Sequence, residues 1–275
     1  MSYHVATFYK FTELHDAASL QQDLKMRCTE HHIKGTILLA TEGLNATIAG
    51  ERHDVERILA FLQADGRFDD MNIKWSEYDS RPFQRMKVRL KNEIVTMGLG
   101  SLDSTADVGQ YVPPTGWNEL LDDPDITVID TRNGFEVEMG TFDSAINPNT
   151  KSFREFTAFV QEELSPDRNP NVALFCTGGI RCEKATSYML DQGFKSVYHL
   201  EGGILNYLTT VDESESRWNG ECFVFDDRIS VIHGAKPGSI QTCKKCSNPL
   251  SVDNSKARDF EAGLCCDSCL DSNET

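Results

Sequence analysis

The feature that most limits the fold of this chain is a regular alternation of short apolar runs and helical segments between residues 117 and 217. The expected strands lie at 127–130, 172–175 and 196–200, and the expected helices at 153–164 and 183–192. Because parallel neighbouring strands need a crossover, and a helix is the usual one, this alternation indicates parallel pairing. We therefore predict an α/β domain at 117–217, with a parallel sheet that carries helices on both faces.

The first hundred residues have a different order of elements. Their patterns predict a strand at 5–11, a helix at 16–32, strands at 35–40 and 45–49, a helix around 55–62 and a strand at 85–96. The resulting order, β-α-β-β-α-β, is typical of ferredoxin-like and acylphosphatase-like sandwiches. Residues 1–98 are therefore predicted to form an α+β domain of this kind.

Two further segments complete the predicted organisation. Residues 98–116 contain four glycines and the pair Pro113-Pro114, so we expect a linker at 99–116. Residues 218–275 are polar and contain six of the nine cysteines. We expect this last segment to form a small cysteine-rich C-terminal module.

Charge and hydropathy limit the classes of partner. No apolar run reaches the ~20 residues that span a bilayer, and the N-terminus has no signal-peptide pattern, so we expect a cytoplasmic protein without membrane contact. A net charge of −16 argues against affinity for nucleic acid over the whole surface. Residues 1–100 carry 13 basic and 14 acidic side chains, whereas the remainder carries 14 and 29. Any RNA-binding surface is therefore expected in the first domain.

The most informative segment is a loop between a predicted strand and a predicted helix. It begins at Cys176, ends at Arg181 and contains Thr177, Gly178, Gly179 and Ile180. Backbone N–H groups of such a turn, the positive end of the helix and the guanidinium of Arg181 all favour a thiolate. We predict that Cys176 is a nucleophile, the alternative being a small residue of the core.

Three residues near this loop have two interpretations each. Cys182 would lie in the first turn of the helix, where it could resolve an oxidised or persulfidated Cys176 as a disulfide, or could simply be buried. Asp130 and Arg132 end a parallel strand at the same edge of the sheet. For these two we favour support of the loop by hydrogen bonds and an ion pair over contact with substrate.

Four segments in this order resemble a rhodanese domain: residues 129–133 (IDTRN), 140–147 (GTFDSAIN), 176–181 (CTGGIR) and 200–204 (LEGGI). The resemblance implies a loop that carries sulfur as a persulfide. Related phosphatases have five residues between the cysteine and the arginine. Here there are four, which disfavours phosphoryl transfer.

A narrower resemblance extends over nearly the whole chain. Residues 82–83, 87–89, 93–98, 176–185 and 220–228 resemble the bacterial rhodanese-domain family of tRNA uridine(34) hydroxylases. The resemblance implies that the protein is an oxidoreductase that uses molecular oxygen to form 5-hydroxyuridine at the wobble position of tRNA, with Cys176 as the essential residue. No flavin, haem or nucleotide-binding motif is visible, so the thiol is the expected redox-active group. The sequence indicates no protein partner.

Two other functions remain open at this point. One is a sulfurtransferase that acts through a Cys176 persulfide. The other is a non-catalytic RNA-binding or redox-sensing protein.

A basic strand is the candidate RNA-binding element. Cations recur at every second position of the last predicted strand of the first domain, at Arg85, Lys87, Arg89 and Lys91. This period puts the four cations on one face of the sheet, where they can follow phosphates, while Met86, Val88 and Leu90 face the core. The alternative is a solvated face. We favour RNA contact because the rest of the chain is so acidic.

The tail contains a candidate zinc site. Nineteen residues separate two C-x-x-C pairs, which consist of Cys243, Cys246, Cys266 and Cys269. This spacing is close to the ~15–20 residues of a four-cysteine zinc ribbon and predicts a structural zinc ion. Cys265 could replace Cys266, and a tail of thiols without metal is the alternative.

Overall fold

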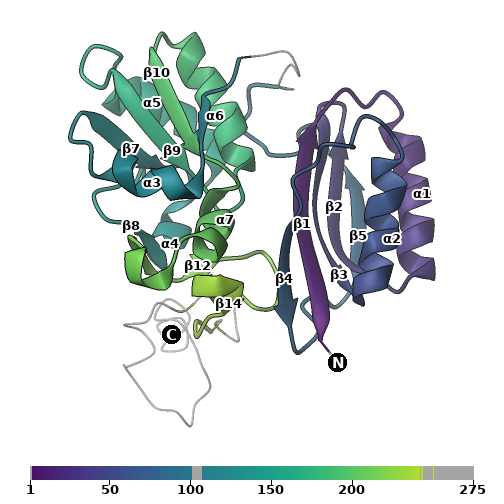
Figure 1. The fold of residues 1–275 in the computed structure, drawn as a ribbon. Helices are drawn as coiled ribbons and strands as arrows, with labels where there is room; N and C mark the ends of the chain where they lie inside the picture. The colour runs from purple at the N-terminus through teal and green to yellow at the C-terminus, as the bar shows by residue number, and fades with distance from the viewer. Residues whose placement is uncertain (1, 101–106, 242, 244–249, 251–275) are drawn as a thin grey trace, which may run out of the picture.

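The computed structural model describes residues 2–100, 107–241, 243 and 250. They form two domains that lie side by side (Figure 1). The last strands of the described chain lie next to the sheet of the first domain. None of the helices among these residues has the length and apolar character needed to span a membrane.

The first domain is a five-stranded sheet covered on one face by two helices. Its elements are β1 (Tyr3–Phe11), α1 (Ala17–Glu30), β2 (Lys34–Ala40), β3 (Gly43–Gly50), α2 (Arg52–Gln63), β4 (Lys74–Tyr78) and β5 (Met86–Leu90). The strand order is β4-β1-β3-β2-β5, in which only β5 and β2 pair in parallel. Leu24 of α1 and Ile58 of α2 are fully buried in one cluster with Phe8, which gives the helix-covered face its apolar core. The predicted acylphosphatase-like α+β architecture is confirmed.

The predicted strand at 85–96 was wrong in length, and the preceding strand β4 was not predicted. Four of the five residues of β4 are half-buried and one is exposed, so their sequence shows no alternation of apolar and polar side chains. Beyond Leu90 the chain leaves the sheet because its backbone is bound by carboxylates. Ile94 N donates to Glu42 Oε1 at 2.7 Å, and Met97 N donates to Glu93 Oε2 at 3.1 Å.

The second domain is a parallel sheet between two layers of helices. Its elements are β6 (Gln110–Val112), α3 (Pro114–Leu121), β7 (Ile126–Asp130), α4 (Gly134–Val137), β8 (Gly140–Phe142), a 3-10 turn (Phe153–Glu155), α5 (Phe156–Glu163), β9 (Asn171–Phe175), α6 (Ile180–Asp191), β10 (Ser196–Leu200), α7 (Gly203–Thr210) and a second 3-10 turn (Glu213–Glu215). The order β6-β10-β9-β7 is parallel throughout.

The central strand β9 shows why helices cover both faces of this sheet. Val172 and Leu174 pack in one cluster with α5 and α6, whereas Phe175 packs in another with α3 and α7. A strand with two buried faces has no polar side, so its sequence is a continuous apolar run. The predicted α/β class of this domain is confirmed.

The predicted linker is folded at its C-terminal end. Residues 110–112 form β6, which pairs with β10, and Pro114 is the first residue of α3. Proline suits this position because the first turn of a helix leaves its N–H groups without intrahelical acceptors. The two prolines therefore start a helix as well as ending the connection between the domains.

The segment after residue 217 begins as part of the second domain. Strand β11 (Trp218–Gly220) pairs with β8, and a small sheet follows from β12 (Cys222–Phe223), β13 (Ser230–Ile232) and β14 (Lys236–Pro237), with a 3-10 turn (His233–Ala235) between the last two. Trp218, Cys222 and Val231 are buried in the same cluster as Trp117 of α3. Residues 218–237 are thus packed on the α/β domain and are not a separate module, because their apolar side chains complete its core.

Candidate active site

The cysteine loop lies between β9 and α6, where the sequence predicts it. Cys176 follows the last residue of β9 and is only 1% exposed. Gly179 has a φ of +97°, and its N–H donates to Cys176 Sγ at 3.1 Å. A side chain at this position would be strained and would lie 2.9 Å from the hydroxyl of Tyr9, so only glycine suits it.

The loop stabilises a thiolate at Cys176. Burial by itself would raise the pKa of this thiol, but a hydrogen bond from Cys182, the charge of Arg181 and backbone N–H groups at the start of α6 together lower the pKa to about 6. These are the helix-terminus and arginine effects expected from the sequence. At neutral pH the buried sulfur is therefore mostly ionised.

Cys182 is the direct neighbour of Cys176 in this site. Burial, followed by the hydrogen bond with the Cys176 sulfur, raises the pKa of Cys182, so its thiol stays protonated and donates to the thiolate. The Cys182 sulfur also lies 3.8 Å from the hydroxyl of Thr131. The site therefore holds a thiolate and a thiol that influence each other, a pair that can be oxidised to a disulfide.

Arg181 is held by a residue that the sequence analysis missed. Its two terminal nitrogens donate to Glu136 at 2.7 and 2.8 Å, and Glu136 is fully buried. Thr177 Oγ1 also donates to Glu136, at 3.4 Å. The available signal was the spacing of Asn133 and Glu136, since a carboxylate three residues after an N-cap marks a capping box at the start of α4.

The start of α7 holds the other side of the loop. Ile204 N and Leu205 N donate to the carbonyl oxygens of Cys176 and Thr177, at 2.9 and 3.0 Å. Gly203 precedes them with a φ of +68°, and a Cβ there would lie 2.4 Å from the carbonyl oxygen of Cys176. Glycine is thus needed at position 203 for the close approach of the two backbones.

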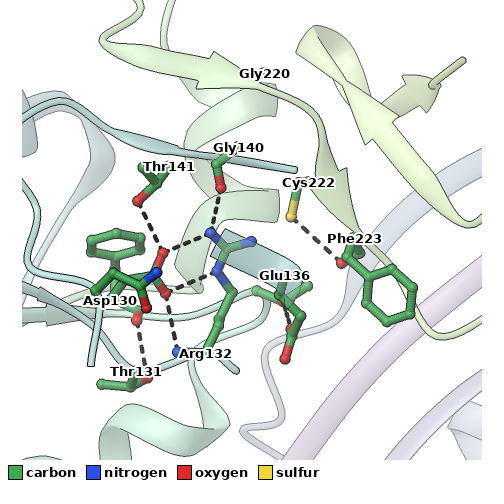
Figure 2. Close-up of polar contacts among 12 residues, drawn as sticks. Asp130, Thr131, Arg132, Glu136, Gly140, Thr141, Gly220, Cys222 and Phe223 are labelled. Carbon is green, nitrogen blue, oxygen red and sulfur yellow. Dashed lines mark hydrogen bonds and ion pairs between the residues drawn. The ribbon is translucent and has the colours of Figure 1, made fainter. Parts of the chain in front are cut away.

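Asp130 and Arg132 form a fully buried ion pair with each other (Figure 2). Arg132 donates to Asp130 through Nε at 2.9 Å and through Nη2 at 2.6 Å, and it also donates to the carbonyl oxygen of Gly140. Thr141 Oγ1 donates to Asp130 Oδ2 at 3.0 Å. These hydrogen bonds connect the end of β7 to β8. None of them reaches a residue of the cysteine loop. Any support of that loop is indirect, through the charge of Arg132 near Glu136.

The first domain faces the cysteine loop with two polar groups, Tyr9 of β1 and Lys74 of β4, and Tyr111 of β6 joins them from the second domain. Tyr9 OH donates to Glu183 Oε1 of α6 at 2.8 Å, and Tyr111 OH donates to Glu183 Oε2 at the same distance. Burial is the largest effect on the Lys74 ammonium, and its pKa falls to about 8. The second-largest effect is the charge of the Cys176 thiolate, which acts in the opposite direction. The ammonium of Lys74 therefore lies within electrostatic reach of the sulfur. A cavity of about 180 Å³ beside Lys74 separates the sheet from α7.

A second group of interdomain contacts is an ion-pair cluster on α6. Lys184 Nζ lies 2.9 Å from Glu42 Oε2 and 2.7 Å from Glu93 Oε2, and all three side chains are buried. Glu42 precedes β3 and Glu93 follows β5, and these two points lie at the same end of the first domain's sheet. The cluster therefore joins this end of the sheet to the helix that follows the cysteine loop.

The basic strand lies at the far edge of this same sheet. Arg85, Lys87, Arg89 and Lys91 are all exposed, as expected, whereas Leu90 is 47% exposed instead of buried because β5 is an edge strand. One row of cross-strand neighbours runs through all five strands. In order from β4 to β5 it consists of Lys74, Thr7, Thr47, Thr36 and Lys87. Paired residues point to one face. The helix-free face therefore has a lysine at each end, one of them near Cys176.

The predicted zinc site can be placed only in part. Cys243 is buried, while Cys246, Cys265, Cys266 and Cys269 lie outside the described residues. Zinc binding by the tail stays a prediction. Within the described ranges, Glu51, His53 and Asp54 bring ligand atoms within 4.8 Å of one another at the start of α2, and there His53 is already paired with both carboxylates.

Comparison with known proteins identifies both domains. Residues 3–94 match the UPF0176 acylphosphatase like domain, and residues 114–210 match the rhodanese-like domain. Among solved structures, a rhodanese-like domain from Anabaena overlaps 41% of this chain and 80% of its own, with 16% identity and a TM-score of 0.34.

Two curated relatives are similar over nearly the full chain. A tRNA uridine(34) hydroxylase of Acaryochloris marina is 52% identical over 95% of this chain and 84% of the relative. A protein of the same name from Picosynechococcus is 50% identical over 98% of this chain and 90% of the relative. This chain therefore belongs to the tRNA uridine(34) hydroxylase family.

Proposed function

We propose that this protein is an oxidoreductase that hydroxylates carbon 5 of the wobble uridine of tRNA, with molecular oxygen as co-substrate and Cys176 as the essential residue. Similarity to the curated hydroxylases over nearly the whole chain supports the substrate. The observation that carries the role of Cys176 is its depressed pKa of about 6 in a loop built around its sulfur. A low-pKa thiolate is a nucleophile at neutral pH.

The pair of sulfurs supports a balanced redox reaction. Hydroxylation puts one oxygen atom of O₂ into the C5–H bond, and the second oxygen atom leaves as water after taking up two electrons and two protons. Oxidation of the Cys176 thiolate and the Cys182 thiol to a disulfide supplies the two electrons and one proton, and solvent supplies the second proton. The two thiols lie in the same buried site and influence each other's pKa, so a local movement of the loop would bring the sulfurs to the ~2.05 Å of a disulfide. A low-molecular-weight thiol then reduces the disulfide and completes the cycle.

The helix-free face of the first domain is the proposed path of the tRNA. Its basic edge offers phosphate contacts at Lys87 and Arg89, and the cross-strand row leads from Lys87 to Lys74 beside the loop. The remainder of the chain carries 29 acidic but only 14 basic side chains, so its net negative charge disfavours contact with phosphates. In this arrangement the basic edge binds the body of the RNA while the wobble base enters the site.

The proposal is tested with purified protein, unmodified tRNA and dithiothreitol under ¹⁸O₂, with nitrogen as the control. Mass spectrometry of the nucleosides should detect 5-hydroxyuridine that carries one ¹⁸O, and only in the oxygen sample. A thiolated nucleoside after addition of a sulfur donor would instead assign sulfur transfer to Cys176. Unchanged tRNA under both conditions would contradict an enzymatic role.

A further inference from the structure

Three phenylalanine side chains form an exposed aromatic cluster on the second domain. The rings of Phe135 and Phe223 lie 5.2 Å apart between centroids, and those of Phe223 and Phe225 lie 4.8 Å apart, both edge to face. Phe225 is 64% exposed and Phe135 is 39% exposed. The Phe223 ring points away from the buried Asp130–Arg132 pair (Figure 2). Grouped aromatic rings at a surface indicate a binding site.

The turn that carries Phe225 is held in place on both sides. Val224 N donates to the carbonyl oxygen of Ile229 at 2.8 Å, which closes the turn. Arg228 donates to Asp226 at 2.6 Å within the turn and to Ser76 Oγ of β4 at 2.6 Å. Asp227 N donates to the carbonyl oxygen of Pro82, at 2.9 Å. The exposed ring is therefore presented by a segment that is hydrogen-bonded to the first domain.

The cluster borders the cysteine loop. The guanidinium carbon of Arg181 lies 5.9 Å from the centre of the Phe225 ring. Phe135 is next in sequence to Glu136, which holds Arg181 in the loop of Cys176. An aromatic surface thus continues directly into the loop.

The size and position of the cluster favour a nucleobase over a protein partner. Three aromatic side chains offer at most ~750 Å² even when fully exposed, which is below the ~800 Å² that each partner buries in a stable protein interface. A base that reacts at a buried sulfur must leave the stack of the anticodon, and aromatic rings compensate for the lost stacking. We propose that Phe225, backed by Phe223 and Phe135, is the surface on which the unstacked wobble base of tRNA stacks. This inference rests on the proposed hydroxylation of that base.

The test measures binding of an anticodon stem-loop RNA to Phe225→Ala, Phe225→Leu and Phe225→Trp. Stacking on an aromatic ring is worth enough that its loss should weaken binding about 5- to 150-fold in the first two variants. Phe225→Trp should bind as the wild type does. Met26→Ala is the matched control, because Met26 is 61% exposed on α1 and should leave affinity unchanged. The same series is repeated with an RNA that lacks the base at position 34.

The abasic RNA decides which part of the RNA the ring contacts. All variants should bind it with equal affinity, because the stacking partner is gone. Wild-type affinity of Phe225→Ala for the intact RNA would overturn the inference, as would an equal loss with both RNAs. If wild-type protein hydroxylates tRNA while either result holds, only the stacking surface is wrong. If it neither binds nor modifies tRNA, the proposed function fails as well.

Discussion

Glu136 accepts hydrogen bonds from both terminal nitrogens of Arg181, at 2.7 and 2.8 Å, and both side chains are buried. This bidentate pair fixes the only cation within the cysteine loop. It also helps a buried arginine to stay charged beside a buried sulfur. Burial alone would lower the pKa of Arg181, but Glu136, together with the charges of Cys176 and Asp130, raises it above its usual value. The thiolate is therefore supported by a carboxylate that lies on another element, α4.

We expect Glu136→Gln to lower the free energy of unfolding by about 3 kcal/mol or more, because removal of one partner leaves a buried charge uncompensated. Glu138→Gln is the matched control, since Glu138 is exposed two residues away. Its effect should stay within about 0.5 kcal/mol. Urea unfolding followed by circular dichroism measures both. Equal midpoints for the two variants would show that the pair does not stabilise the fold.

The low pKa of Cys176 predicts a specific pH dependence of alkylation. The thiolate reacts, so the rate of carboxamidomethylation at Cys176 should rise with pH around a midpoint of about 6, well below that of an ordinary cysteine. Cys182→Ala removes a donor to the thiolate and should move the midpoint to higher pH. Cys28→Ala is the control, because Cys28 is buried in the other domain. Peptide mass spectrometry across a pH series gives each rate. A midpoint that does not move in Cys182→Ala would contradict the contact between the sulfurs.

Lys184 should be among the most sensitive positions for stability. Lys184→Met leaves Glu42 and Glu93 buried without their cation, and we expect a loss of about 3–5 kcal/mol in the free energy of unfolding. The hydrogen bond from Lys184 helps to lower the pKa of Glu93 against the effect of burial. The loss should therefore shrink at acidic pH, where Glu93 protonates. Lys195→Met, at an exposed position of the same domain, is the control. Equal unfolding midpoints for both variants at pH 7 would argue against the cluster.

The basic strand is tested by its salt dependence. Replacing Lys87 and Arg89 by glutamine should weaken tRNA binding and reduce the slope of log K against log salt by roughly one for each lost phosphate contact. Lys25→Gln with Arg57→Gln removes the same charge from the helix-covered side and should change the slope little. Alkylation of Cys176 should be unaffected by either pair. If both double variants bind tRNA equally at several salt concentrations, the strand is only a solvated face.

The sequence predicts most of the second domain because its strands are buried on both faces. The run from Val172 to Phe175 has no polar residue to obscure it, and the glycines after Cys176 mark the turn. By contrast, β4 was missed because its half-buried residues, such as Lys74 and Trp75, lack a period. Local patterns also cannot show which distant residues meet. Tyr9 and Lys74 reach the cysteine loop only through tertiary packing. For Glu136, the capping-box spacing marks the start of a helix but not the contact with Arg181.

The most direct measurement of the central claim is the amount of 5-hydroxyuridine formed in tRNA by Cys176→Ser under air. The substitution changes volume little but removes the low-pKa thiolate, so we predict no product above background from a folded protein. Cys28→Ser should form product at the wild-type rate. Wild-type product formation by Cys176→Ser would contradict the account.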